Sequence, residues 1–117
     1  MRQELGKLGE DLACTYLKQR GYKILTRNYR KPVGEIDIIC KIGEIIIFVE
    51  VKTRTSLEFG YPEEAVNNSK RKTIRTVARH YLQENNHYYK EIRFDVISIL
   101  MQNKNQNQII NHIEAAF

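Results

Sequence analysis

The feature that most constrains the fold of this chain is an unbroken apolar run at positions 45–49, Ile-Ile-Ile-Phe-Val. Isoleucine, valine and phenylalanine all favour β-strands. Because neighbouring side chains on a strand point to opposite faces, a continuous apolar run gives a strand that is buried on both faces. The sequence therefore predicts a central strand in a sheet that is covered on both sides.

Two helices are expected to supply these covers. Apolar residues recur at helical spacing over residues 3–20, and Gly21 follows as a helix stop. A second apolar stripe predicts a helix over residues 63–84. The side chains expected to face the core are Leu5, Leu8, Leu12, Tyr16 and Leu17 in the first helix, and Val66, Ile74, Val77, Ala78, Tyr81 and Leu82 in the second.

Strand formers and turn residues divide the rest of the chain. The predicted strands cover residues 22–29, 35–41, 44–52, 91–100 and 108–113, and polar loops are expected over residues 53–62 and 102–108. The order α-β-β-β-α-β-β predicts a mixed central sheet flanked by helices, of the α/β (α+β) class. A chain of 117 residues is expected to form one domain, spanning residues 1–117.

Composition narrows the setting in which the chain works. The formal net charge of +5 suits an anionic partner, most simply nucleic acid. No apolar run approaches the roughly 18 residues of a membrane span, and the first residues lack a signal-peptide pattern. Cys14 and Cys40 are isolated, so we expect reduced thiols in a cytoplasmic protein with no membrane contact.

An acid-x-lysine triplet ends the central strand. Glu50 and Lys52 are two residues apart and share a face of that strand. A hairpin turn at Gly43 and Glu44 would place Asp37 opposite Glu50, with Cβ atoms roughly 4.5–5.5 Å apart. Two such carboxylates would seat a hard divalent cation. The alternative is a cross-strand cluster in which Lys52 balances two surface acids.

Further motifs extend over essentially the whole chain and give a family resemblance. They are Gly6-x-x-Gly9-Glu10-x-x-Ala13, Gly21-Tyr22, Arg27-Asn28, Gly34-Glu35-Ile36-Asp37, Phe48-Val49-Glu50-Val51-Lys52-Thr53-Arg54, Arg93-Phe94-Asp95 and Ala116-Phe117. Together they resemble the bacterial YraN-like family, which is largely uncharacterised. That family is similar to the restriction-endonuclease-like nucleases and, in fold, to archaeal Holliday-junction resolvases.

This resemblance implies a metal-dependent endonuclease that acts on DNA, including branched or damaged DNA. It implies that Asp37, Glu50 and the Val51 carbonyl coordinate Mg²⁺ or Mn²⁺, and that Lys52 orients the attacking water or neutralises charge on the phosphate. Glu10 would reach the metal directly or through water, or would instead be a solvated helix carboxylate. A resolvase role would also imply a homodimer, because symmetric cutting of a junction needs two sites.

Basic residues are candidates for contact with the phosphate backbone. Lys70 lies in line with the core-facing stripe of the second helix, so it could reach the acids, or its stem could cover the core edge while its amine reaches water. Arg71, Arg75 and Arg79 recur every four residues and predict a solvent-facing ridge. The expected nucleic-acid contacts are Arg54, Lys70, Arg71, Arg75, Arg79, Arg27, Arg30 and Lys31.

Two other functions stay open at this point. The chain could be a nucleic-acid-binding module or partner protein that makes no cut, or a protein-interaction scaffold. The three histidines lack zinc-site spacing, and the sequence has no GxSxG, Walker A or GxGxxG pattern, so no nucleotide cofactor is expected. Glu35 could widen the acidic site, but it is expected to pair with a nearby cation. Arg93 and Asp95 are expected to form an internal ion pair.

Overall fold

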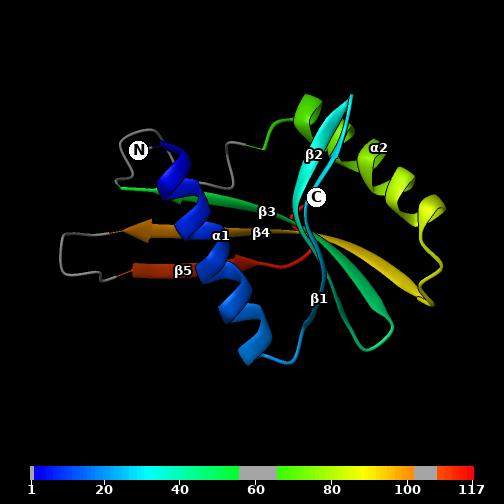
Figure 1. Cartoon of the computed structure of the whole chain (residues 1–117), viewed down its shortest axis with the longest axis horizontal. Coiled ribbons are helices and arrows are strands. Elements are labelled where there is room, and N and C mark those ends of the chain that lie inside the picture. Colours follow the sequence, from blue (N-terminus) through cyan, green and yellow to red (C-terminus); the bar gives the residue numbers. More distant parts are fainter. Residues whose placement is uncertain (1, 56–65, 102–107) are drawn as a thin grey trace.

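A computed structural model describes residues 2–55, 66–101 and 108–117 of the chain. Its elements follow the predicted order: α1 (Arg2–Gln19), β1 (Lys23–Lys31), β2 (Gly34–Ile42), β3 (Ile45–Arg54), α2 (Asn68–Glu84), β4 (Glu91–Met101) and β5 (Gln108–Ile113). The expected mixed sheet with two flanking helices is confirmed (Figure 1). Neither helix is long and apolar enough to cross a membrane, among the residues described.

The central strand of the sheet is β3. The strands lie in the order β1-β2-β3-β4-β5; β3 and β4 run parallel, and every other neighbouring pair is antiparallel. Parallel neighbours need a crossover connection, and α2 lies within the segment that joins them. This parallel pairing brings the C-terminal ends of β3 and β4 to the same edge of the sheet. The connection between the two strands, from Arg54 to Glu91, contains 36 residues.

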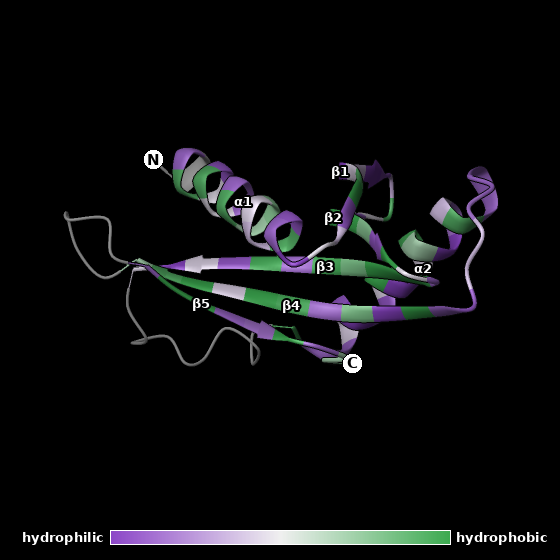
Figure 2. Cartoon of the chain, turned by 90° about the horizontal axis from the view of Figure 1, so that it is seen from below, coloured by the Kyte–Doolittle hydropathy of each residue, from purple (hydrophilic) through white to green (hydrophobic). Residues whose placement is uncertain are grey.

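Two separate cores explain why β3 is apolar over residues 45–49. On one face Ile46 and Phe48 pack in a cluster with Ile74, Val77 and Tyr81 of α2. On the other face Ile47 and Val49 pack in a cluster with Ala13 and Leu17 of α1. Figure 2 shows α1 lying along one face above the apolar middle of β3 and β4. The sequence-based prediction of a strand covered on both sides is confirmed.

Several element boundaries differ from the predictions. The second helix begins at Asn68, where the Asn67 side chain caps it by accepting from the Lys70 amide at 2.9 Å. Its predicted start at residue 63 lies outside the described residues. Val66 is buried as expected but precedes the helix. Strand β3 runs two residues past its predicted end, because pairing with β4 continues to Arg54.

Some predictions fall outside the described residues or fail within them. Residues 56–65 and 102–107, which contain most of the two predicted loops and the predicted start of the second helix, are not described. Leu8 was expected in the core but is 44% exposed, because α1 turns Ala13, Cys14 and Leu17 toward the sheet. Both cysteines are free and buried, as expected of reduced thiols.

The β2–β3 hairpin has the predicted register but opens near its far end. Paired residues run from Ile42–Ile45 to Ile38–Val49, so Asp37 and Glu50 are the next two opposed positions. Regular alternation would put Ile36 and Ile38 on one face, yet they lie in different cores. Strand β2 therefore turns over at Asp37 and leaves β3, and the tip of the β1–β2 hairpin rises beside α2 (Figure 1).

The predicted ion pair on β4 is the centre of a buried network. Asp95, which is fully buried, accepts two hydrogen bonds of 2.8 Å from Arg93. His112 lies 2.7 Å from the same carboxylate, and the Ala115 amide donates to it at 3.0 Å. The network ties β4 to β5 and to the turn after it, in addition to the backbone pairing of the two strands.

Two glycines of α1 have opposite structural roles. A Cβ atom at Gly9 would overlap the Thr53 side chain of β3, with the Thr53 Cβ only 3.0 Å away, so glycine permits the close approach of α1 to the sheet. Among the described residues, a Cβ at Gly6 would meet nothing within 4 Å. Close packing against these residues therefore explains Gly9 but not Gly6.

We expect alanine at these two positions to act in opposite directions. Gly9→Ala should lower the free energy of unfolding by about 1–3 kcal/mol, because it overpacks the contact with Thr53. Gly6→Ala should raise it by about 0.5–1 kcal/mol, because alanine is the better helix former. Urea unfolding followed by circular dichroism measures both values, and equal effects at the two positions would contradict the packing difference.

Candidate active site

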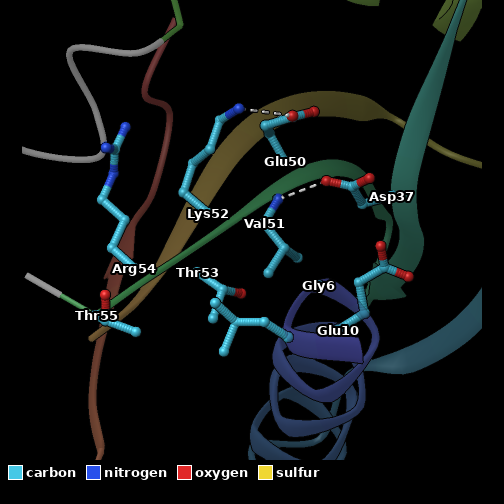
Figure 3. A pocket seen from close by; sticks show the side chains of 10 residues that line it. Gly6, Glu10, Asp37, Glu50, Val51, Lys52, Thr53, Arg54 and Thr55 are labelled. Carbon is cyan, nitrogen blue, oxygen red and sulfur yellow. Dashed lines mark hydrogen bonds and ion pairs between the residues drawn. The ribbon is translucent and has the colours of Figure 1, made fainter. Parts of the chain in front are cut away.

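A cavity of about 490 Å³ lies where β2 leaves β3. Its walls come from the first turns of α1, from Asp37 on β2 and from the end of β3 (Figure 3). The lining residues are Leu5, Gly6, Glu10, Asp37, Glu50, Val51, Lys52, Thr53, Arg54 and Thr55. The structure thus brings the predicted acids and Lys52 together at one cavity.

The Asp37 side chain provides the hydrogen bond that Val51 lacks where β2 leaves β3. Its Oδ2 accepts a hydrogen bond of 2.8 Å from the Val51 amide, which would otherwise lack a partner on that side of β3. Since the N–H and C=O of one strand residue point to the same side, the Val51 carbonyl also faces this open edge. Burial and the nearby Glu50 charge raise the pKa of Asp37 to about 7, although the Val51 amide acts against both.

Glu50 lies between two lysines. The residue is only 7% exposed, and its Oε1 lies 2.7 Å from Lys70 Nζ and 3.4 Å from Lys52 Nζ. Of the two alternatives for Lys70, the one in which it reaches the acids is therefore confirmed. Burial and the adjacent Lys70 lower the pKa of Lys52. Burial also lowers the pKa of Lys70, but its hydrogen bonds to Glu50 and Lys52 outweigh this and raise it overall.

Glu10 enters the cavity from α1, on the side of the sheet opposite α2. Its side chain is 19% exposed, which does not fit a freely solvated helix carboxylate. Arg27 Nη2 lies 3.8 Å from Glu10 and 2.8 Å from Asp11, so these two acids hold the Arg27 side chain against α1. Glu35 pairs with Arg30 at 2.7 Å, as expected.

The donor set suits a hard cation only in part. Across residues 2–55, 66–101 and 108–117, no three His, Cys, Asp or Glu side chains lie close enough to form a metal-binding group by themselves. Two carboxylates and a backbone carbonyl nevertheless fit Mg²⁺, which is commonly held by one or two carboxylates and keeps several waters. Burial and the Glu50 charge both raise the pKa of Asp37, and a bound cation would oppose both effects. Coordination by these residues and by Glu10 stays a prediction.

The expected phosphate contacts are scattered over the molecule. Only Arg54 and Lys70 lie at the acid-lined cavity. The Arg54 Nε is buried and has no hydrogen-bond partner among the described residues, a cost of roughly 1–3 kcal/mol for a buried donor. Lys31 pairs with Glu84 at 2.7 Å, away from the cavity.

The arginine ridge of α2 is only partly as predicted. Arg79 and Arg75 are exposed. Arg71, however, donates from Nε to the Val66 carbonyl at 2.8 Å, and both Arg71 and Arg75 lie over the Phe117 ring. The prediction of a wholly solvent-facing ridge is therefore wrong, because the end of the chain packs against two of its three members.

A second cavity, of about 650 Å³, adjoins the first. It is lined by Gly6, Lys7, Glu10, Arg27, Asn28, Arg30 and Glu35, so the two cavities share Gly6 and Glu10. Sequence reasoning missed Gly6 and Lys7 as cavity residues. Their positions four and three residues before Glu10, on one helix face, could have pointed to them.

Fold and site together define an α+β protein whose mixed sheet carries a cavity lined by acids and lysines at an opened strand edge. Residues 9–99 match the family described as "Uncharacterised protein family UPF0102". The chain belongs to this family.

Relatives from several bacteria align over nearly the whole chain. A UPF0102 protein of Alkaliphilus oremlandii is 49% identical over 119 residues and covers 100% of both chains. One from Clostridioides difficile is 50% identical over 93% of this chain and 96% of its own, and one from Dictyoglomus thermophilum is 48% identical over 85% and 84%. The expected membership of a largely uncharacterised family is confirmed, and the nuclease relationship stays a prediction.

The raised pKa of Asp37 should make stability depend on pH. Between about pH 4 and pH 7 the unfolded chain has lost the Asp37 proton while the folded chain keeps it, so this group lowers stability as pH rises through that window. Asp37→Asn removes the titration and keeps an acceptor for the Val51 amide. Relative to the unaltered chain, we expect the free energy of unfolding of the variant to be roughly 2–4 kcal/mol more favourable at pH 8 than at pH 4. Urea unfolding at the two pH values measures this difference.

Asp11→Asn is the matched control for this measurement. Asp11 pairs with Arg27 on the exposed side of α1 and lines neither cavity. The free energy of unfolding of Asp11→Asn, relative to the unaltered chain, should be no higher at pH 8 than at pH 4. An Asp37→Asn effect that is the same at both pH values would contradict the electrostatic coupling of Asp37 and Glu50.

Proposed function

We propose that this protein is a metal-dependent endonuclease that hydrolyses phosphodiester bonds of DNA, with branched or damaged DNA as the expected substrate. The observation that carries the proposal is the meeting of Asp37, Glu50 and Lys52 in one cavity at the opened edge of β3. A DNA substrate and free thiols suit the cytoplasm. Symmetric cutting of a junction would require a homodimer.

Asp37, Glu50 and the Val51 carbonyl would hold Mg²⁺ or Mn²⁺, with Glu10 in reach from α1. The cation would supply Lewis acidity for hydrolysis of the phosphate. The protein fixes both carboxylates in advance, since the Val51 amide holds Asp37 and Lys70 holds Glu50. Groups that are already in position need no reorganisation when charge develops on the phosphate.

Lys52 is the candidate for orienting water or neutralising the phosphate. Its Nζ is the weaker of the two partners of Glu50, at 3.4 Å against 2.7 Å for Lys70. Its lowered pKa, caused by burial and by Lys70, means that it holds its proton less tightly than an ordinary lysine. Lys52 is therefore the more available of the two lysines for a phosphate oxygen, while Lys70 acts by positioning Glu50.

One observation favours a second candidate, a nucleic-acid-binding module that makes no cut. Glu50 is already neutralised by two lysines, and the cavity lacks a close group of three acidic or histidine ligands among the described residues. In such a module the lysines would balance Glu50 permanently. DNA binding would then fall steeply with salt and show no dependence on Mg²⁺ or Mn²⁺.

Metal titration and cleavage assays separate these candidates. We expect calorimetry to detect Mg²⁺ or Mn²⁺ binding, with DNA present if phosphate is needed to complete the site. We also expect metal-dependent cleavage of branched, nicked or single-stranded DNA. The double variant Asp37→Asn/Glu50→Gln should lower metal affinity and cleavage by about 100-fold or more, because both carboxylate ligands lose their charge.

The matched control is Asp11→Asn/Glu44→Gln, which makes the same chemical changes at residues that line neither cavity. It should cleave like the unaltered chain. Cleavage that persists in chelator, or in the Asp37→Asn/Glu50→Gln variant, would overturn the endonuclease proposal. Salt-sensitive DNA binding without metal-dependent cleavage would favour the second candidate.

A further inference from the structure

None of the described residues packs closely enough on α1 to require glycine at position 6. Gly6 lies within α1, where glycine is a poorer helix former than alanine, and a Cβ atom there would meet no described atom within 4 Å. Gly9, one turn later, differs because Thr53 leaves no room for a Cβ. A residue that weakens local structure without improving the packing is expected mainly at functional sites.

The space beside Gly6 belongs to both cavities. Gly6 and Glu10 line the acid-lined cavity on one side and the second cavity, with Lys7 and Arg30, on the other. A side chain at position 6 would meet no atom of the described residues within 4 Å of its Cβ, so it would fill cavity space. Figure 3 places Gly6 on the turn of α1 that faces the acids, next to Glu10.

The charges along the two cavities change sign twice. The acids Glu10, Asp37 and Glu50 lie in the middle. Beyond them, on the β3 side, is Arg54, which also lines the acid-lined cavity and brings a positive charge to it. On the opposite side are cations of α1 and β1.

These cations are available to a ligand. Lys7 is exposed, and Arg30 is 74% exposed in its pair with Glu35. Exposed ion pairs of this kind are weak, so phosphate oxygens could replace the carboxylate at little cost. The second cavity therefore offers positive charge on the far side of the acids from Arg54.

We propose that the two cavities form one groove, and that a DNA sugar–phosphate backbone lies in it over Gly6. One flanking phosphate contacts Arg54, and a phosphate on the other side of the acids contacts Lys7 and Arg30. The absence of a side chain at Gly6 lets the backbone approach α1 closely enough to pass from one cavity to the other. This inference rests on the proposed function for the placement of the cleaved phosphate at the acids.

The decisive variant is Gly6→Leu, with Thr15→Leu as the matched control on an exposed position of the same helix. Binding of single-stranded and duplex DNA oligonucleotides is measured by fluorescence anisotropy at low salt in chelator. We expect Gly6→Leu to weaken binding by at least about tenfold while the melting temperature stays the same or rises. Thr15→Leu should bind like the unaltered chain, and whichever strand form shows the loss is the one that the groove receives.

A second pair of variants tests the same path without altering the helix backbone. Lys7→Gln should reduce the slope of log K against log salt by about one, as expected for the loss of one phosphate contact. Lys18→Gln, the same change at the other end of α1, should leave the slope unaltered. This pair keeps the inference testable even if Gly6→Leu fails to fold.

The outcomes separate the groove from the chemistry. Weaker binding by Gly6→Leu, without metal-dependent cleavage by the unaltered chain, would support the groove and overturn the endonuclease. Normal binding and cleavage by Gly6→Leu would overturn the groove and leave the endonuclease standing. If the unaltered chain binds neither oligonucleotide, the groove is overturned as well.

Discussion

The burial of β3 on both faces is the constraint on which the rest of the structure depends. With α1 on one face and α2 on the other, side chains from the two helices cannot meet through the middle of the sheet. They can approach the same point only where a strand edge is open. The departure of β2 at Asp37 creates that opening, so Glu10 from one layer and Lys70 from the other both reach the end of β3.

Local pattern was enough to predict the hairpin and its register. The apolar run of β3 and Gly43, which adopts a positive φ of 56° at the turn, fix the opposed positions of Asp37 and Glu50. The sequence did not predict that β3 continues to Arg54, because Thr53 and Arg54 are held by pairing with β4. The two strands are far apart in the sequence, so no local pattern shows this pairing. The ion pair that holds Arg27 was missed for a similar reason, since its partner Asp11 lies on another element.

The arrangement of the candidate site lowers the stability of the folded protein. Asp37 and Glu50 repel each other in a half-buried cavity, and Arg54 keeps a buried donor without a described partner. The protein offsets only part of this through Lys70 and the Val51 amide. Elsewhere the same chain satisfies a fully buried carboxylate completely, at Asp95 with Arg93 and His112. The contrast shows that the open site reflects its location and not a general looseness of polar packing.

The parallel pairing of β3 with β4 also has a consequence for the order of folding. Such non-local pairing pays its loop-closure entropy before its contacts form, so it is slow compared with a hairpin. Lys70 lies inside the crossover that must close, whereas Asp37 and Glu50 lie on the β2–β3 hairpin. The hairpin therefore brings the two acids and Lys52 together before Lys70, the closer partner of Glu50, can join them. The cavity gains this second lysine only when the crossover between β3 and β4 has closed.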